Sequence, residues 1–314
     1  MITLPPLGFG AAPIGNLYAP VEEEDALAAV AAAWDAGVRY FDTSPHYGLG
    51  LSERRLGAAL ATRPRNSYVV STKVGRVLEP VSGDGDDLAN GFAVPATHRR
   101  VWDFGADGVR RSLESSLDRL GLDRVDLALL HDVDLNPSQR DRAASEGLAA
   151  LADLRDQGVV RAIGVGLNHW EMAEWFVRET VIDAVILAGR YTLLEQSAVA
   201  SFLPLCEERG VAVVAAGVFN SGLLARPEVP DDATYDYAAA PPELIARARR
   251  IAAVCGRHGV SLPQAAIQFP SRHPAVVSVL VGARSAEEVR VNAEYAASPV
   301  PAGLWEDLRS EGLL

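Results

Sequence analysis

The sequence has few cysteines and no excess of positive charge. Cys206 and Cys255 are the only cysteines in 314 residues, and both fall in helix-like stretches, so neither a disulfide framework nor a paired-cysteine metal site is expected. The 29 Lys and Arg against 41 Asp and Glu give a formal net charge of −12. This balance argues against a nucleic-acid partner, because phosphate contacts need a basic surface.

Long hydrophobic runs are also missing. The longest ones, such as Val211–Phe219, fall well short of the roughly 18 residues that span a membrane. The N-terminal segment Met1–Pro6 has neither a basic region nor a long apolar region, so no signal peptide is expected. We therefore expect a cytoplasmic protein with no membrane contact, in a compartment that keeps its two thiols reduced.

Short apolar runs alternate with longer amphipathic or alanine-rich stretches, a pattern typical of βα units and a parallel sheet. Eight runs predict strands: Leu7–Gly10, Val38–Asp42, Tyr68–Thr72, Val125–Leu130, Ala162–Val165, Ala184–Leu187, Val211–Ala215 and Val276–Val281. Eight strands close a (β/α)8 barrel, and 314 residues are compatible with one such domain spanning 1–314. The competing architecture is an open doubly wound sheet, but the sequence has no G-x-G-x-x-G motif after any predicted strand.

Helix ends and long loops complete this prediction. Two helices are predicted to stop at glycine, Ala26–Ala36 at Gly37 and Leu148–Gln157 at Gly158, and two to start at capping boxes, Asn168 with Glu171 and Ser285 with Glu288. The stretches Arg76–Gly105 and Leu223–Pro242 exceed what a bare barrel needs. Both follow strand ends, where barrels build active sites, so we expect extended loops that cover the substrate.

Ionisable residues stand at three successive strand ends. Asp42 closes the second predicted strand, Lys73 follows the third and His131 follows the fourth, while Tyr47 lies five residues beyond Asp42. A phenol ionises near pH 10, and an adjacent ammonium lowers that value by favouring phenolate. Asp42 can hold Lys73 by a salt bridge, and His131 can donate a hydrogen bond to a substrate oxygen. The set indicates general acid/base chemistry with Tyr47 as the proton carrier.

Each of these residues also has a structural interpretation. Asp42 can cap a turn, Lys73 can be a solvated loop residue and His131 can be a buried imidazole whose hydrogen bonds are satisfied. A metal site from His131, Asp132 and Asp134 is a further alternative, but one histidine beside carboxylates is a common surface arrangement, and no metal is expected. A glycosidase needs two facing carboxylates, and the strand ends offer only Asp42.

The sequence resembles the aldo-keto reductase superfamily over essentially the whole chain. The resemblance rests on four segments: Gly37–Ser44 with Tyr47-Gly48 and Ser52-Glu53, then Ser71–Lys73, Leu129–His131 and Gly158–Val165. It implies that Asp42, Tyr47, Lys73 and His131 hold the catalytic positions. Leu187–Leu194 and Gly217–Leu224 are similar to the sugar-dehydrogenase branch, which includes aldose, L-fucose, L-galactose and pyridoxal dehydrogenases. Sugar oxidation at the anomeric carbon, giving a lactone, is the activity that this branch implies.

The resemblance also implies residues that hold a nicotinamide dinucleotide. The loop after the seventh strand would wrap the pyrophosphate, and the last strand with the helix after it would receive the adenosine end. Asn168 is either a ligand of the nicotinamide amide or a helix cap. The cofactor candidates are Asn168, Gly217, Phe219, Asn220, Ser221, Gly222, Leu224, Gly282, Arg284, Glu288 and Asn292.

Departures from the family pattern affect the choice of cofactor. Ala216 and Ala188 stand where many relatives have a stacking aromatic residue and a carboxamide-binding glutamine. Gly282 and Glu288 stand where many NADP-dependent relatives have Lys and Arg, so NAD is favoured over NADP, although Arg284 can pair with a 2′-phosphate, stack on adenine or be solvated.

Three hypotheses for function follow. The first is a sugar dehydrogenase that acts on a small-molecule aldose. The second is a general aldehyde, ketone or pyridoxal reductase or dehydrogenase with the same machinery. The third is a regulatory barrel that binds a dinucleotide without turnover, against which the intact quartet argues. His46, Trp102, Arg190 and Phe219 are the substrate-facing candidates. The sequence does not indicate the sugar, the direction of the reaction or the oligomeric state.

Overall fold

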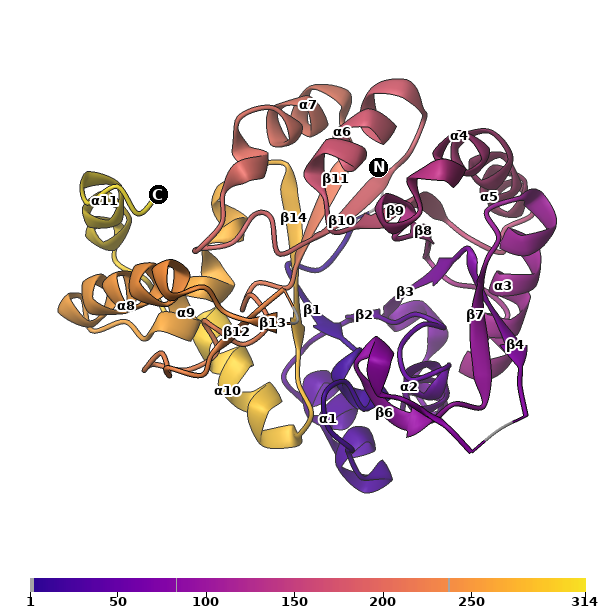
Figure 1. Ribbon diagram of the computed structural model, residues 1–314, viewed down its shortest axis with the longest axis horizontal. Helices are drawn as coiled ribbons and strands as arrows, with labels where there is room; N and C mark the ends of the chain where they lie inside the picture. The colour runs from indigo at the N-terminus through magenta and orange to yellow at the C-terminus, as the bar shows by residue number, and fades with distance from the viewer. Residues whose placement is uncertain (1–2, 83, 237) are drawn as a thin grey trace.

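Eight parallel strands close into a barrel at the centre of the computed structural model, which describes residues 3–82, 84–236 and 238–314. Figure 1 looks along this barrel and shows the helices arranged around it. In order around the barrel the strands are β1 (Leu7–Gly10), β2 (Tyr40–Asp42), β3 (Val69–Val74), β8 (Leu127–His131), β9 (Ala162–Leu167), β10 (Ala184–Ala188), β11 (Ala212–Ala216) and β14 (Val276–Gly282). All eight predicted strands are present, and because β14 pairs with β1 the open doubly wound sheet is excluded.

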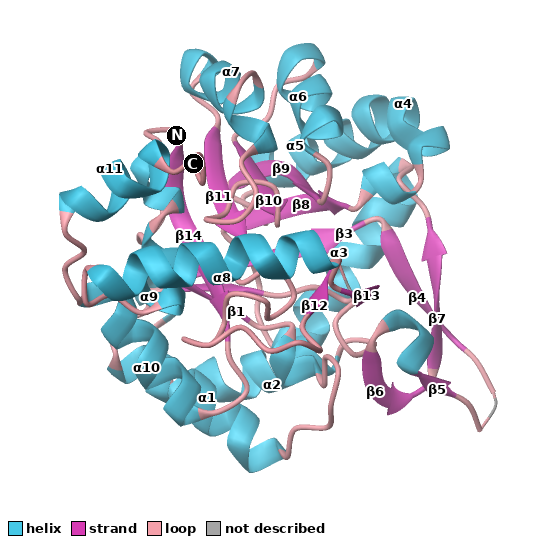
Figure 2. Cartoon of the chain, turned by 60° about the vertical axis from the view of Figure 1, so that its left-hand side comes forward, coloured by secondary structure: helices cyan, strands magenta, loops and turns pink. Residues whose placement is uncertain are grey.

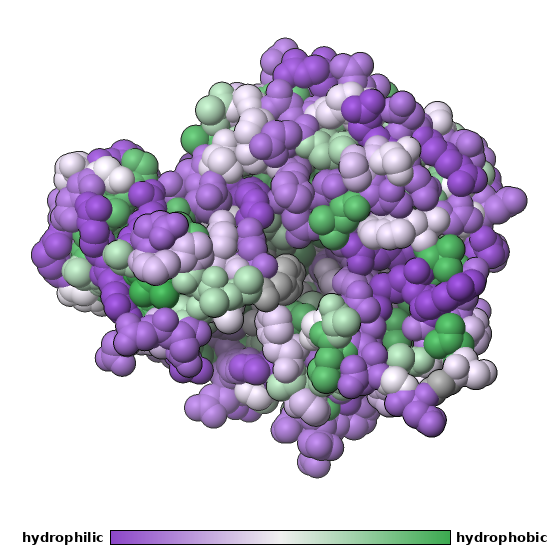
Figure 3. Space-filling model, viewed as in Figure 1, coloured by the Kyte–Doolittle hydropathy of each residue, from purple (hydrophilic) through white to green (hydrophobic). Residues whose placement is uncertain are grey.

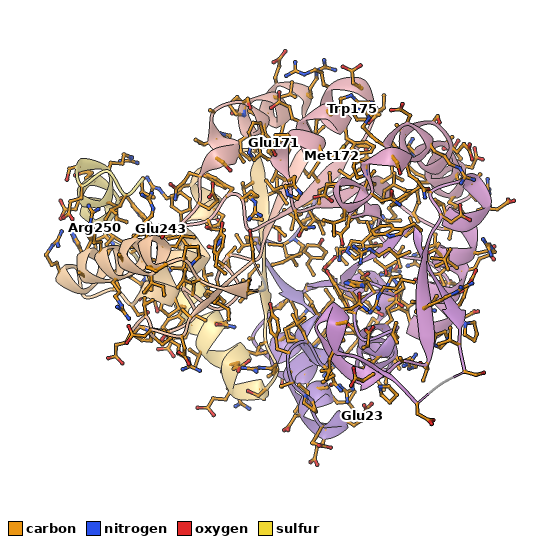
Figure 4. The ribbon with its side chains drawn as sticks, viewed as in Figure 1. Glu23, Glu171, Met172, Trp175, Glu243 and Arg250 are labelled. Carbon is orange, nitrogen blue, oxygen red and sulfur yellow. The ribbon has the colours of Figure 1, made fainter. Side chains whose placement is uncertain are left out.

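Alternating side chains in these strands build two separate cores. Leu127 and Leu129 of β8 pack with Tyr40 and Ile186 in a cluster enclosed by the strands, whereas their neighbours Ala128 and Leu130 join the larger cluster between strands and helices. This is the period-two alternation of a strand with two buried faces. Figure 4 accordingly shows side chains filling the ring of strands, while the labelled Glu23, Glu171 and Glu243 lie on helices outside it.

Helices follow most strands and form the outer layer. They are α1 (Glu23–Asp35), α2 (Leu51–Leu60), α3 (Ala106–Leu120), α4 (Arg140–Arg142), α5 (Leu148–Asp156), α6 (Trp170–Glu179), α7 (Phe202–Arg209), α8 (Pro242–Arg257), α9 (Leu262–Gln268), α10 (Ala286–Ala297) and α11 (Ala302–Ser310). Gly37 and Gly158 follow α1 and α5 with φ of 87° and 78°, as predicted. None of the helices in the described ranges is long and apolar enough to cross a membrane.

The two predicted capping boxes have different outcomes. Ser285 caps α10, since its Oγ accepts a hydrogen bond from the amide of Glu288 at 3.2 Å. The capping box of Asn168 and Glu171 is wrong. His169 occupies the cap position of α6, and the amides of Asn168 and His169 both donate to Asp134 Oδ2, at 2.8 and 2.9 Å. A carboxylate from the preceding βα loop therefore takes the place of the local cap.

Both long loops contain short antiparallel pairs at the C-terminal end of the barrel. After β3, β4 (Arg76–Pro80) pairs with β7 (His98–Trp102), and β5 (Asp86–Asp87) pairs with β6 (Phe92–Pro95). After β11, β12 (Thr234–Tyr235) pairs with β13 (Ala238–Ala239). Figure 2 shows the β4–β7 pair beside the barrel and the β12–β13 pair over the strands. Residues 83 and 237 of these loops, like Met1 and Ile2 of the N-terminal segment, lie outside the described residues.

Candidate active site

The four candidates from successive strand ends converge at one side of the barrel mouth. Asp42 ends β2, Lys73 lies near the end of β3 and His131 ends β8, and these three strands are neighbours in the barrel. Lys73 Nζ lies 2.7 Å from Asp42 Oδ2 and 4.7 Å from the centre of the Tyr47 ring. The rings of Tyr47 and His131 have centroids 6.0 Å apart. The expected grouping of an ammonium, a carboxylate, a phenol and an imidazole is therefore present.

Lys73 is held as a buried cation. Its ammonium donates to Asp42 Oδ2 and, at 2.9 Å, to the carbonyl of Thr43, while Ser71 donates to the other Asp42 oxygen at 2.6 Å. Burial disfavours the charged amine, but the charges of Asp42 and Tyr47 outweigh it, so the pKa of Lys73 is raised above its ordinary value. Lys73 is also the only lysine among the 29 basic residues of the sequence. The site therefore keeps one permanent positive charge beside the phenol.

Tyr47 differs from expectation in the direction of its pKa. Burial raises the pKa of the phenol, and this effect exceeds the lowering caused by the charge and hydrogen bond of Lys73, so the pKa of Tyr47 is raised above its ordinary value. The expectation that the ammonium would bring the value down is wrong for the sum of the effects, although Lys73 itself acts in that direction. In this environment Tyr47 carries its proton at neutral pH. It is set up as a proton donor, and becomes a base as pH rises.

His131 is a neutral imidazole with a defined proton. Burial and the nearby charges of Arg76 and Lys73 hold the pKa of His131 well below its ordinary value. Ser44 Oγ lies 3.1 Å from His131 Nδ1 and accepts a hydrogen bond from the backbone amide of His46, also at 3.1 Å. The Ser44 hydroxyl hydrogen is thus available to Nδ1, which favours the tautomer protonated at Nε2. An Nε2–H group can donate to a substrate oxygen.

A second layer of charged residues surrounds His131. Asp132 Oδ2 lies 3.3 Å from His131 Nε2 and forms an ion pair with Arg76, and Asp132 Oδ1 accepts from Asn168 Nδ2 at 2.9 Å. Burial raises the pKa of Asp132 to about 6, with Arg76 opposing the rise. The sequence patterns point to Asp132 only as a metal ligand and do not single out Arg76 or Ser44 as site residues. Arg76 and Asp132 were both detectable from the sequence, because Arg76 lies four residues after the predicted strand Tyr68–Thr72 and Asp132 lies two residues after Val125–Leu130.

The metal interpretation is not supported by the geometry. The Asp134 side chain is 2% exposed, and its Oδ2 accepts from the ring and the backbone amide of His169. No cluster of three or more His, Cys, Asp or Glu residues suited to a metal ion occurs within the described part of the chain.

The predicted pyrophosphate loop is a series of tight turns. Gly217, Asn220, Ser221 and Gly222 have φ of 62°, 47°, 57° and 98°, and nothing lies within 4 Å of a Cβ placed on Gly222. Asn220 is buried, and its side chain accepts a hydrogen bond from Thr192 at 2.7 Å and donates one to the carbonyl of Gly189 at 3.3 Å. The side chain of Leu224 is fully buried and that of Phe219 is half-buried. Asn220 and Leu224 thus shape the loop, and open space remains beside Gly222.

At the predicted adenosine end, the charges are already paired. Gly282 ends β14 and is exposed, and Arg284 forms an ion pair with Glu288 at 3.3 Å. Glu288 Oε2 also accepts from the amide of Arg284 at 2.8 Å, and Asn292 lies one turn further along α10. The Arg284 guanidinium is therefore partly neutralised where a 2′-phosphate would lie.

Besides Phe219 in the loop after β11, the other three substrate-facing candidates, His46, Trp102 and Arg190, lie in different surroundings. His46 stacks edge-on against His131 and Phe92, and burial with the charges of Arg76 and Arg100 lowers its pKa to about 2. Trp102 covers the Arg76 guanidinium, whose Cζ lies 4.3 Å from a ring centroid. Arg190 forms an ion pair with Asp236, in the loop of the β12–β13 pair, at 2.7 Å. Figure 3 shows this face of the molecule with a hollow near its middle.

The barrel thus carries a lysine–aspartate pair, a tyrosine and a histidine at its mouth, a set whose chemistry suits proton transfer. The model of the Aldo/keto reductase family matches residues 6–310. The chain belongs to this family and is an NAD(P)-dependent enzyme.

Three relatives match nearly the whole chain. This chain is 49% identical to D-threo-aldose 1-dehydrogenase from Pseudomonas sp., and the match covers 100% of this chain and 95% of the relative. It is 41% identical to pyridoxal 4-dehydrogenase from Microbacterium luteolum, with the same coverage, and 32% identical to L-galactose dehydrogenase from Arabidopsis thaliana, covering 97% and 88%. These names fall in the branch that the sequence indicated.

Solved structures agree on the fold. A glycerol dehydrogenase from Gluconobacter oxydans superposes with a TM-score of 0.77 at 24% identity, covering 97% of this chain and 90% of that one. An aldo-keto reductase from Bacillus halodurans in its holo form gives 0.73 at 24% identity, covering 97% and 91%.

Proposed function

We propose that this enzyme, acting as one domain over residues 1–314, oxidises an aldose at its anomeric carbon to a lactone, with NAD or NADP as hydride acceptor. The observation that carries the proposal is the contact of Tyr47 with the buried Lys73–Asp42 pair beside neutral His131. The 49% identity to an aldose 1-dehydrogenase supports the substrate class. The sole lysine of the chain lies beside Tyr47, which supports the same chemistry. The ammonium of lysine is a compact point charge, whereas the guanidinium of arginine is broad and planar.

The reaction assigns a separate task to each residue. His131 Nε2–H donates to the anomeric oxygen and orients it, and Tyr47 takes the hydroxyl proton from the same oxygen. The C1–H bond breaks as hydride leaves, the C1–O bond becomes a carbonyl, and a lactone results. When bound, the nicotinamide ring supplies the two-electron acceptor for that hydride. Lys73 stabilises the negative charge that Tyr47 carries before it takes the proton, and Asp42 keeps Lys73 charged and in place.

The residues present fit a dinucleotide. The open backbone at Gly222 allows close approach of a pyrophosphate, and the start of α10 offers amide groups to a phosphate. We propose that Gly217, Phe219, Ser221 and Gly222 line this site through backbone or ring contacts, that Asn220 and Leu224 hold the turns, and that Gly282, Arg284, Glu288 and Asn292 meet the adenosine. Asn168 does not cap α6, and in this proposal it bonds the carboxamide while its Nδ2 donates to Asp132.

A second candidate is oxidation of pyridoxal or reduction of simple aldehydes. The 41% identity to a pyridoxal 4-dehydrogenase favours it, and the same proton machinery would serve. Polar groups are the difference: a sugar needs many hydrogen-bonding partners around the reacting carbon, whereas a site for simple aldehydes can be largely apolar. The polar layer of Arg76, Asp132 and Asn168 around His131 favours the sugar.

Trapping the product with hydroxylamine tests the proposal. We expect at least one of L-fucose, L-galactose or a D-threo-aldose to reduce the cofactor and to give early product that hydroxylamine converts into a coloured ferric hydroxamate, the signature of a lactone. Pyridoxal and simple aldehydes, assayed with both cofactors, complete the panel. Rapid turnover of those substrates with no trappable lactone from any aldose would reject the sugar assignment and leave the family assignment intact.

Cofactor preference is expected to depend on the Arg284–Glu288 pair. We expect NAD to be preferred, and Arg284→Ala to weaken NADP binding roughly 10-fold or more with a much smaller effect on NAD, since charge-assisted contacts to phosphate contribute about 1.5 to 3 kcal/mol. The matched variant Glu288→Gln frees the guanidinium and should strengthen NADP binding. Fluorescence titration with both nucleotides measures this. Equal losses for both nucleotides in Arg284→Ala would place the guanidinium against adenine instead.

A further inference from the structure

We propose that Asp132, held by Arg76, is the specificity residue of this site: its carboxylate binds the hydroxyl group on the carbon next to the reacting carbon of the sugar. The inference rests on the proposed aldose oxidation and names the hydroxyl that the enzyme recognises. It assigns Asp132 to contact with substrate rather than to the proton transfer of Tyr47 and His131.

The Arg76–Asp132 pair has the position that a substrate-binding group requires. Arg76 begins the loop after β3 and Asp132 begins the loop after β8, so both follow strands that carry catalytic candidates. Asp132 Oδ2 lies 3.3 Å from His131 Nε2, the atom that faces the reacting oxygen in the proposed mechanism. The charge of Arg76 lowers the pKa of both His46 and His131, which places the guanidinium within electrostatic reach of both rings.

Stability does not explain this pair. The side chains of Arg76 and Asp132 are 7% and 13% exposed. In a buried ion pair the attraction between the charges offsets little more than the free energy lost by removing them from water. Asp132 also has a φ of 50°, a left-handed conformation that costs a non-glycine residue energy. An energetically unfavourable charge on a strained backbone, next to the catalytic imidazole, is typical of a functional group rather than a structural one.

The bonding capacity of the pair matches a hydroxyl group. An ionised carboxylate can accept about four hydrogen bonds. Asp132 accepts one from Arg76 and one from Asn168, so it can accept a further hydrogen bond from a substrate. A sugar hydroxyl can donate to it, whereas the ring oxygen and a carbonyl oxygen have no hydrogen to donate. Arg76 Nε and His46 Nδ1 are buried without a hydrogen-bond partner among the described residues, so further polar groups at this place await a partner.

The spacing selects which hydroxyl is bound. The donor on His131 and the acceptor on Asp132 are 3.3 Å apart, so two oxygens bound by them lie at a similar separation. Oxygens on adjacent carbons of a sugar ring in a gauche arrangement meet this condition. With the anomeric oxygen on His131, the second oxygen is the 2-hydroxyl group.

The test compares the best aldose of the panel with its 2-deoxy analogue. We expect the wild-type enzyme to prefer the 2-hydroxy sugar by about 10- to 100-fold in kcat/KM, the size of a hydrogen bond to a charged group. Asp132→Gly, which suits the positive φ and removes the carboxylate, should bring the two sugars to within about twofold of each other. Asp103→Asn is the matched control, since it removes a charge of the same sign from an aspartate that follows β7 and pairs with Arg111 of α3, and it should keep the wild-type preference.

The outcomes separate the two proposals. If no aldose is oxidised to a lactone, the proposed function fails and the specificity role of Asp132 fails with it. If aldoses are oxidised but Asp132→Gly slows both sugars equally and leaves the preference intact, Asp132 acts through His131 and the inference is overturned while the function stands. Melting temperature and cofactor affinity report whether each variant is folded. If Asp132→Gly alone does not fold, the double variant Asp132→Gly with Arg76→Gln removes the guanidinium that the single variant leaves unpaired.

Discussion

Replacement of Tyr47 by phenylalanine is expected to lower turnover by a factor of at least about 100 while cofactor affinity stays the same. General acid/base groups typically contribute 10²- to 10⁴-fold, and the substitution removes only the oxygen that carries the proton. The ring remains packed against Phe92 and His131, whose centroids lie 6.1 and 6.0 Å away, so the fold of the loop should persist. Steady-state kinetics and a nucleotide titration measure both quantities.

Tyr68→Phe is the matched control for this experiment. Tyr68 packs against Trp34 and Phe41 on the helix side of the barrel, and loss of its hydroxyl should leave turnover within about twofold of the wild type. Turnover of Tyr47→Phe near the wild-type value would remove Tyr47 from the mechanism.

Replacement of Lys73 by methionine is expected to lower turnover at neutral pH and to move the rising limb of the oxidation rate to higher pH. Burial already raises the pKa of Tyr47, and Lys73 is the main influence that lowers it. Without the cation the pKa of the phenol rises further, so a higher pH is needed to form phenolate. A pH–kcat profile for aldose oxidation measures the displacement. A profile with its limb unchanged would contradict the coupling between the two groups.

Stability must be controlled in this variant. Removal of Lys73 leaves the buried Asp42 without its cation, which costs about 3 to 5 kcal/mol when one partner of a buried ion pair is lost. The double variant Lys73→Met with Asp42→Asn removes both charges and should recover much of that stability, yet keep the displaced pH limb. Thermal unfolding of both variants separates loss of fold from loss of chemistry.

The barrel and its quartet were accessible from sequence because both depend on local patterns. Each strand is a short apolar run with a distinct end, so the sequence alone predicts Asp42, Lys73 and His131 at one face of the barrel. The direction of the Tyr47 pKa was not accessible, because it depends on how deeply the phenol is buried relative to the distance of one ammonium. Local sequence pattern therefore predicts where the site residues lie, whereas the direction of the Tyr47 pKa shift depends on burial in the folded protein.

Long-range contacts account for the other differences. Asn168 has the residue type and spacing of a helix cap, but Asp134, 34 positions earlier, takes the amides and leaves Asn168 for Asp132. Asn220 looks like a phosphate-loop residue, yet its side chain bonds Thr192 inside the fold. Such competition for a hydrogen-bond partner depends on which loops meet at the barrel mouth, and single-sequence patterns do not carry that information.

The sole lysine has a consequence for covalent labelling of this enzyme. Every other basic side chain is an arginine, so a reagent that acylates amines finds one side-chain target, and that target is 3% exposed beneath Tyr47. Acylation of Lys73 therefore requires the mouth of the barrel to open and the Asp42 ion pair to break. Acylation of Lys73 by an activated ester, located by peptide mapping, therefore reports opening of the catalytic centre.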